Sequence, residues 1–222
     1  MSWWEYVLRA LPAAGFVALL LFSFVGRSIV RRYRDWWLLR RLRRETARPV
    51  ATLPEGQEVK VVGRARALDE TLTAPLSGRA CVYYEAKART TSCSGRDEGF
   101  PDECREARGV PFVIDDGSAQ AVVDPTGAVV LLEVDHRSED RTAQNEALLH
   151  RHGLTFDERC TYEFAEAVIE IGETVAVSAV AAREPNGRGT GGAYRLAPTT
   201  VRLLRTPQTP VVVSDRAPAT EK

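Results

Sequence analysis

The strongest metal-binding candidates in this sequence are two histidines and a cysteine near the end of a predicted helix. His150, His152 and Cys160 have side chains of the kind that bind zinc. A structural zinc site needs a fourth ligand and a characteristic spacing, and we recognise neither here. Basic side chains in the last turn of a helix also favour its dipole. We therefore expect the histidines to be structural, and the sequence predicts neither a metal site nor a cofactor.

Cys81 is the candidate nucleophile. It lies in a segment rich in strand-forming residues, next to Val82 and Tyr83. A small buried thiol is common in such a place, and nucleophilic catalysis would need a neighbouring base. Catalysis by this thiol is not expected.

Asp115 and Asp116 form the clearest pair of carboxylates. They precede Gly117 in a predicted tight turn, where aspartate side chains brace the backbone. No catalytic residue is predicted, and we lean away from an enzyme. An enzyme would require distant polar side chains to converge in one cleft, the candidates being Asp115, Glu133, His150 and Tyr162.

The segment from Thr90 to Arg108 is the expected functional loop, because it is long, charged and interrupted by Pro101. It carries Cys93 and Cys104. In an oxidising compartment these cysteines could close a disulfide, whereas in the cytoplasm they should stay free. Free thiols on an exposed loop suit a redox or metal role; the alternative is a variable insertion whose cysteines are incidental.

The charges are balanced in total but unevenly distributed along the chain. The 222 residues include 30 Lys and Arg against 30 Asp and Glu. Residues 1–48 hold ten arginines and three acidic residues, a net charge of +7, which leaves −7 for the remainder. An acidic folded part argues against nucleic acid as the partner. Four cysteines in a chain of this length exclude a disulfide-based scaffold.

An uncharged stretch at residues 10–26, behind a short N-terminal segment at 1–9, is the predicted membrane span. As a helix it is roughly 26 Å long, enough to cross a bilayer core. Tryptophans before and after it match the aromatic belts at the two membrane surfaces. No signal-peptide cleavage site follows the stretch.

Residues 27–48 are predicted to continue as a basic interfacial helix. Arginines that flank a span stay in the cytoplasm, so the following domain is expected on the cytoplasmic side of a single-pass cell-membrane protein. The arginines either bind anionic headgroups or act only as a topology signal. The residues expected at the membrane interface are Trp3, Trp4, Arg27, Arg31, Arg32, Arg34, Trp36, Trp37, Arg40 and Arg41.

After Pro49 the composition changes to alternating β-branched residues, which indicates a β domain over residues 50–205. One helix should begin at Ser138 and end at Gly153. A Pro-rich flexible tail is expected at 206–222, in which Val211 to Val213 could add a short edge strand. Strands are expected at 58–68, 80–90 and 201–204, with a three-stranded meander at 110–134 and a hairpin of 160–171 with 174–182 around Gly172.

This pattern of short strands with one inserted helix predicts a mainly β fold. A small OB-like barrel or sandwich fits it better than an α/β sheet. Nothing in the pattern suggests parallel strands.

Three motifs in the β domain resemble the GIDE domain, also called the BAM ("beside a membrane") domain. The first is Pro75-Leu76-Ser77-Gly78 followed by Cys81, Tyr83 and Tyr84; the second is Phe112 with Asp115-Asp116-Gly117; the third is Glu170 with Gly172-Glu173. The resemblance covers residues 50–205. It implies a β domain held close to a membrane.

Family members related to the mitochondrial E3 ubiquitin ligase Mulan combine this domain with two spanning helices and a RING finger. A RING binds two zinc ions through eight Cys and His residues, whereas this chain has four cysteines and three histidines. The resemblance therefore implies the domain and not the ligase reaction. We expect a membrane-anchored module that binds a protein or small ligand at the cytoplasmic face. The alternative is a non-RING subunit or platform of a ubiquitin-ligase-like or other enzyme system.

Overall fold

The computed structural model describes residues 30, 32–94, 103–185 and 199–220. The predicted span at 10–26 lies outside these residues, as do Trp3, Trp4, Arg27 and Arg31. Within the described ranges, no helix is long and apolar enough to cross a membrane. The chain divides into two compact units, residues 1–41 and 42–222.

The described part of the smaller unit is helical. Residue 30 and residues 32–44 form a helix, inside the range 27–48 where a basic helix is predicted. Arg34 pairs with Asp35 on this helix at 3.2 Å. The helix continues past residue 41, so its last residues belong to the larger unit.

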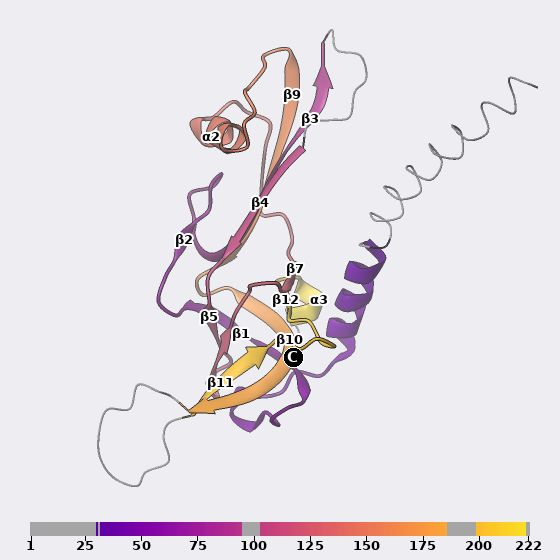
Figure 1. Ribbon diagram of the computed structural model, residues 1–222, viewed down its shortest axis with the longest axis vertical. Coiled ribbons are helices and arrows are strands. Elements are labelled where there is room, and N and C mark those ends of the chain that lie inside the picture. The colour runs from indigo at the N-terminus through magenta and orange to yellow at the C-terminus, as the bar shows by residue number, and fades with distance from the viewer. Residues whose placement is uncertain (1–29, 31, 95–102, 186–198, 221–222) are drawn as a thin grey trace, which may run out of the picture. The chain divides into compact units, whose positions relative to one another are not determined.

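Five strands of the larger unit close into a barrel (Figure 1), so the expected mainly β fold with a small barrel is confirmed. Each strand pairs with the next in the order below, and the last pairs with the first. The order around the barrel is β1 (Glu58–Ala67), β5 (Phe112–Asp115), β6 (Gln120–Val123), β11 (Thr199–Leu204) and β10 (Thr174–Pro185).

Alternating apolar residues of these strands form the barrel interior. Val59 and Val61 on β1 are buried, as are Val175 and Val177 on β10, because every second side chain of a strand points to the same face. Strands β6 and β11 run parallel, a pairing that the sequence pattern did not suggest.

A second sheet has the order β2-β3-β9-β8, with β4 paired to β3. In Figure 1 the two longest strands of this sheet, β3 and β9, run side by side. Leu148 and Leu149 of helix α2 (Ala143–Arg151) are buried, and α2 contacts β3. The strands are β2 (Leu72–Thr73), β3 (Ala80–Cys93), β4 (Glu103–Gly109), β8 (His136–Ser138) and β9 (Cys160–Glu170).

The C-terminal segment is not a flexible tail up to residue 214, and the alternative of a short strand near Val211 to Val213 is confirmed, although this strand has a neighbour on each side and is not at an edge. Strand β12 (Val212–Ser214) pairs with β10 and, in parallel, with β7 (Val129–Leu131). Val211, Val212 and Val213 are buried, and this burial stabilises the segment as a paired strand. Two short helical segments complete the domain, η1 (Val50–Thr52) and α3 (Ala217–Thr220).

Two predicted strand pairings are also wrong. The expected meander has only its first two strands, because β7 pairs with β12 instead of β6. The expected hairpin around Gly172 is a turn that connects the two sheets: β9 pairs with β3 and β8, and β10 pairs with strands of the barrel.

The predicted helix start at Ser138 is wrong as well. The N-cap is Thr142, whose side-chain oxygen accepts a hydrogen bond from Asn145 N at 3.2 Å. Ser138 ends β8 instead. The predicted end is confirmed, because the helix stops before Gly153, which has a positive φ of 72°.

Candidate functional site

A surface cavity of about 390 Å³ lies on the outside of the barrel. Its walls come from the segment after β1, the link between β4 and β5, strand β6 with the residue that follows it, and β11. We call it the barrel groove. It is lined by Leu68, Asp69, Glu70, Val110, Pro111, Val122, Asp124 and Arg202.

Strand register explains why these residues meet. Val122 on β6 is the pairing partner of Arg202 on β11 and of Val113 on β5. Residues paired across neighbouring strands point to the same face of a sheet. The side chains of Val122 and Arg202 therefore lie together on the outer surface, and Leu68, which follows β1, is 41% exposed beside them.

The groove combines apolar side chains with an excess of negative charge. Arg202 pairs with Glu184 at 3.0 Å, so its charge is balanced. Asp124 accepts a hydrogen bond from Thr126 N at 2.9 Å. Asp69 and Glu70 have no cation within salt-bridge distance among the described residues. Such a surface favours a ligand that carries both positive charge and apolar groups.

A buried glutamate explains the motif at residues 75–78. Glu166 on β9 is completely buried and accepts hydrogen bonds from Leu76 N at 2.7 Å and Ser77 N at 3.0 Å. Gly78 has a positive φ of 72°, which glycine adopts without strain. The motif is therefore a loop held in place by an internal carboxylate.

The carboxylates of the second motif brace a turn, as predicted. Asp115 accepts a hydrogen bond from Gly117 N at 2.9 Å, and Gly117 has a positive φ of 87°. Asp116 accepts hydrogen bonds from Ser118 N at 2.8 Å and from Val50 N at 2.9 Å. The Asp116 carboxylate thus connects the turn between β5 and β6 to the start of the domain.

The predicted buried thiol of Cys81 is observed, with no exposed surface, and burial raises its pKa to about 11. Tyr83 and Tyr84 follow it on β3. The Tyr84 hydroxyl donates to Glu106 at 2.5 Å, and burial together with this carboxylate raises the pKa of Tyr84 to about 12. Glu106 also accepts a hydrogen bond from Arg151 Nε at 3.0 Å, so this cluster fastens helix α2 to the sheet.

The cysteine pairing differs from the expectation. Cys93 forms a disulfide with Cys160, its pairing partner at the ends of β3 and β9, and not with Cys104. Cys104 is buried opposite Ala88. The expected long loop is shorter than predicted because β3 extends to residue 93 and β4 begins at residue 103, a register that sequence separation alone does not reveal.

Carboxylates gather where β9 turns into β10. Burial, together with the nearby carboxylates of Asp215 and Asp135, raises the pKa of Glu173 to about 7. Burial likewise raises the pKa of Asp215 to about 6. A carboxyl group with a pKa near 7 can transfer protons, but these two already accept backbone hydrogen bonds, from Glu170 N and Glu133 N. Their geometry is that of structural braces.

The polar residues that an enzyme would bring together lie on separate elements and have different partners. Asp115 bonds to its own turn, and the backbone of Glu133 bonds to Asp215. His150 lies in the last turn of α2. The Tyr162 hydroxyl accepts a hydrogen bond from Asp157 N at 3.0 Å. None of the four lines the barrel groove.

Neither the residues of the barrel groove nor Glu166 was predicted from the sequence as a functional or structural site. Glu166 is one of several glutamates on a strand of alternating polarity, and only its inward orientation sets it apart. The groove residues come from four separate segments, which makes them hard to associate in advance. The adjacent Asp69-Glu70 pair, in a segment that joins two strands, is the one signal that could have pointed to the groove.

Comparison with protein-family models, with curated proteins and with solved structures finds no match for this chain.

Proposed function

We propose that this chain is a membrane-anchored binding module of the GIDE type without a RING finger, and that it binds a protein partner through the barrel groove. The observation that carries the proposal is the groove itself, with apolar side chains beside two carboxylates that no described residue neutralises. The partner segment should contain basic side chains next to apolar ones. This combination complements the groove in both charge and polarity.

The strand order supports an OB-like barrel. Counted along the chain, the barrel strands follow the order 1-2-3-5-4, with the third and fifth parallel. OB-like barrels commonly bind ligands on the face of their second and third strands. In this chain those strands are β5 and β6, and β6 contributes Val122 to the groove. The support is an analogy of fold, because such barrels host many functions.

The roles of the motif residues support the GIDE resemblance. Two of the three motifs have structural roles in the β domain: the loop at residues 75–78 binds Glu166, and the turn at residues 115–117 is braced by its own carboxylates. These contacts explain the residue types at those positions.

The membrane anchor rests on the uncharged stretch at 10–26 and on the arginines that follow it. We place the β domain on the cytoplasmic side, since positive charge flanking a span is retained there. Cytoplasmic thiols are kept reduced, so on that side of the membrane the Cys93–Cys160 disulfide of the structure should be open in cells and form only on oxidation. A pair that is fully oxidised in cells would instead place the domain on the opposite side.

The binding proposal is tested by affinity purification of the full chain in mild detergent. Partners retained by the natural chain are compared with those retained by an Asp69→Lys/Glu70→Lys variant. The matched control is Glu55→Lys/Glu139→Lys, which makes the same charge change at exposed positions outside the groove. Loss of a partner in the first variant alone supports the groove; equal retention by both variants refutes it.

The anchor is tested separately by alkaline carbonate extraction of cell membranes. A chain that spans the bilayer stays in the membrane pellet, because carbonate releases only peripheral proteins. Release into the supernatant would refute the anchor and leave the groove proposal standing.

A further inference from the structure

The helix of residues 32–44 exposes an unusual number of aromatic rings. Tyr33 is 67% exposed, Trp36 50% and Trp37 48%, and Val30 on the same helix is 67% exposed. Large rings are normally buried, and a contiguous exposed group of them marks an interaction surface. Leu38 and Leu39 of the same helix are buried. The helix therefore has a buried side and an exposed side, and the aromatic rings lie on the exposed side.

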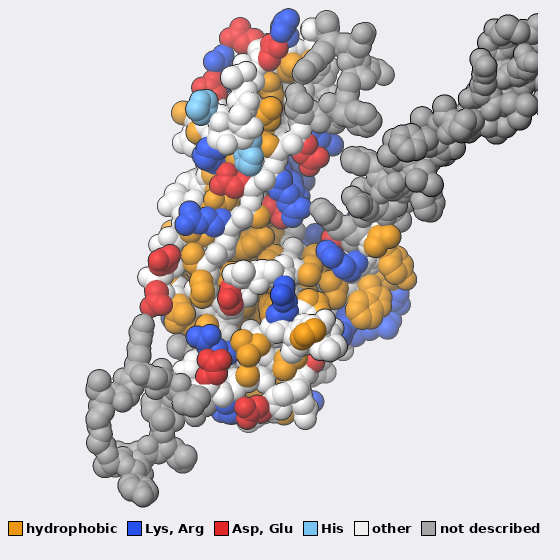
Figure 2. Space-filling view, viewed as in Figure 1, with side chains coloured by type: hydrophobic (Ala, Val, Ile, Leu, Met, Phe, Trp, Pro, Cys, Tyr) orange, Lys and Arg blue, Asp and Glu red, His pale blue; other side chains and the backbone are white. Residues whose placement is uncertain are grey.

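Arginines lie one helical turn after the rings and stack on them. The Arg40 guanidinium lies over the Trp36 ring at 5.1 Å from its centroid, and Arg41 lies over Trp37 at 5.7 Å. Side chains four residues apart are neighbours on a helix, so these two pairs occur side by side. Together Tyr33, Trp36, Trp37, Arg40 and Arg41 form what we call the Trp–Arg face. Figure 2 shows orange side chains beside blue ones on this helix.

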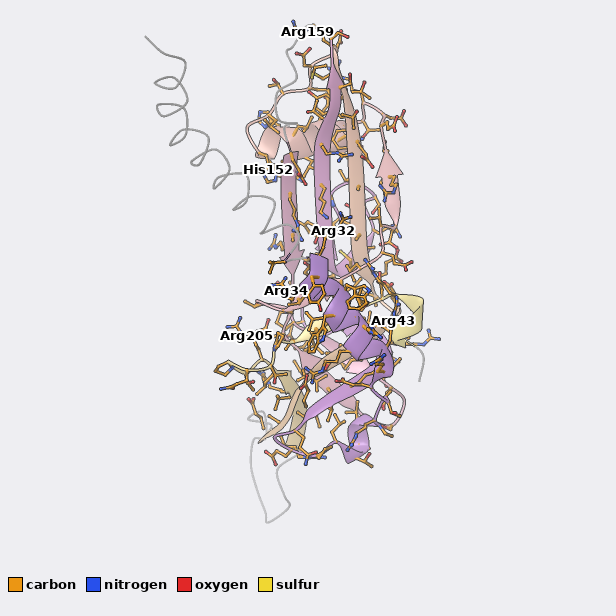
Figure 3. The ribbon with its side chains drawn as sticks, turned by 90° about the vertical axis from the view of Figure 1, so that its right-hand side faces the viewer. Arg32, Arg34, Arg43, His152, Arg159 and Arg205 are labelled. Carbon is orange, nitrogen blue, oxygen red and sulfur yellow. A yellow bond between two sulfur atoms is a disulfide. The ribbon has the colours of Figure 1, made fainter. Side chains whose placement is uncertain are left out.

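The positive charge of the helix is largely unbalanced. Asp35 is paired with Arg34. Arg40 has no acidic partner among the described residues, and neither do Arg32 and Arg43, which Figure 3 labels on the same helix together with Arg34. A guanidinium has five N–H donors, so one that lies over an aromatic ring can still donate hydrogen bonds from its edge. Stacked arginines of this kind are suited to phosphate oxygens.

We infer that the Trp–Arg face binds the phosphate headgroups of anionic lipids, with each tryptophan holding its arginine in position; this deepens the proposed membrane anchor. The rings occupy the interfacial layer, where tryptophan is favoured, and the guanidinium edges bind phosphate. The face is selective for anionic lipid because its net positive charge meets a negative surface.

Length determines how the helix must lie. Trp36 comes ten residues after Gly26, which ends the apolar stretch. A straight helix of ten residues is about 15 Å long. The headgroup layer is only about 5–8 Å thick on each side of the bilayer. The rings therefore reach lipid only if the helix lies along the membrane surface, which distinguishes this inference from a helix that projects into solvent.

The test uses the full chain in vesicles of phosphatidylcholine containing 30% phosphatidylglycerol, a proportion chosen at about the level at which surface charge attracts basic segments. Trp3 and Trp4 are replaced by Phe, so that fluorescence comes from Trp36 and Trp37. Brominated phosphatidylglycerol and brominated phosphatidylcholine are compared as quenchers at equal mole fraction. We expect stronger quenching by the anionic lipid, with a local enrichment of about fivefold per arginine.

Three variants separate the explanations. Arg40→Gln/Arg41→Gln should equalise the two quenchers, whereas Arg64→Gln/Arg108→Gln, which removes the same charge from exposed strand positions, should not. Arg40→Lys/Arg41→Lys keeps the charge but loses the planar stack, and should lose part of the preference. A lysine variant that matches the natural chain would overturn the role of the stacked pairs.

Quenching and carbonate extraction together distinguish a failure of the headgroup-binding inference from a failure of the proposed membrane anchor. If the chain resists carbonate extraction while neither lipid quenches Trp36 and Trp37, the anchor stands and the inference is refuted. If carbonate releases the chain but the anionic lipid still quenches these rings selectively, the inference stands and the spanning anchor is refuted. Equal quenching by both lipids in the natural chain refutes the headgroup selectivity.

Discussion

Replacing Glu166 with glutamine should destabilise the β domain far more than the same replacement at Glu163 on the same strand. Glu166 is fully buried and accepts hydrogen bonds from Leu76 N and Ser77 N. Glutamine keeps one carbonyl oxygen for one of these N–H groups, but its NH2 group faces the other. The variant therefore loses one hydrogen bond to a charged acceptor and leaves a buried donor without a partner.

The size of the effect follows from these two losses. A hydrogen bond to a charged group contributes about 1.5–3 kcal/mol, and an unsatisfied buried donor costs about 1–3 kcal/mol. Removing a buried charge offsets part of this loss, so we expect a net cost of about 3 kcal/mol. For a domain of this size that cost lowers the melting temperature by about 6–12 °C.

Glu163 is the matched control. It pairs with Arg89 and Arg137, each at 2.9 Å, on the solvent-exposed side of the sheet. Each surface ion pair contributes about 0–1 kcal/mol, so the loss of both pairs should cost at most about 2 kcal/mol, and Glu163→Gln should lower the melting temperature less than Glu166→Gln does. Both variants carry the same chemical change, and burial is what separates them.

Thermal unfolding of the full chain in detergent gives the melting temperatures of both variants. Hydrogen exchange of backbone amides reports on the loop at residues 75–78 directly. The amides of Leu76 and Ser77 should lose protection in Glu166→Gln and keep it in Glu163→Gln. Equal melting temperatures together with retained protection at these two amides would refute the idea that the buried carboxylate holds the loop.

Three further predictions concern other parts of the domain. Gly63→Ala should destabilise the barrel by about 1–3 kcal/mol, because the added Cβ would lie 2.6 Å from the backbone oxygen of Asp115; thermal unfolding tests this, and an unchanged melting temperature would contradict it. The pKa of Glu173 is raised to about 7 from 4.5, so the folded state holds a proton that the unfolded state releases, and stability falls as pH rises from about 4.5 to about 7. Glu173→Gln should reduce that fall, so the melting temperature of the variant, measured relative to that of the natural chain, should be higher at pH 8 than at pH 5. Parallel pH profiles for variant and natural chain would refute this. Reducing the Cys93–Cys160 disulfide, which links positions 67 residues apart, should cost about 2–4 kcal/mol, seen as a lower melting temperature with reductant; Cys93→Ser should show no response to reductant.

Local patterns in the sequence predicted the elements better than their pairing. The strands at 58–68 and 80–90 form close to the expected positions, as β1 and β3. The turn at residues 115–117 also forms as expected, since its aspartates and glycine act within a few residues of one another. By contrast, β9 and β10 follow one another around Gly172, as a hairpin would, and yet belong to different sheets.

Candidate site residues were predicted less well, for the same reason. The sequence suggested Cys104 as the disulfide partner of Cys93 in an oxidising compartment, and this pairing is wrong. The correct partner, Cys160, becomes its neighbour through the register of β3 and β9. The barrel groove likewise depends on side chains from separate strands that meet only when the barrel closes.

The sequence by itself determined where the apolar stretch, the basic helix and strands such as β1, β3, β9 and β10 lie, because each of these follows from charge or periodicity within a short window. Only the tertiary structure decided that β6 and β11 pair in parallel, that Glu166 points inward to the loop at residues 75–78, and that Cys160 faces Cys93. The physical reason is that alternation identifies the buried face of a strand but not its neighbour. The neighbour is chosen by packing among residues far apart in the chain, where the entropy of loop closure depends only weakly on their separation.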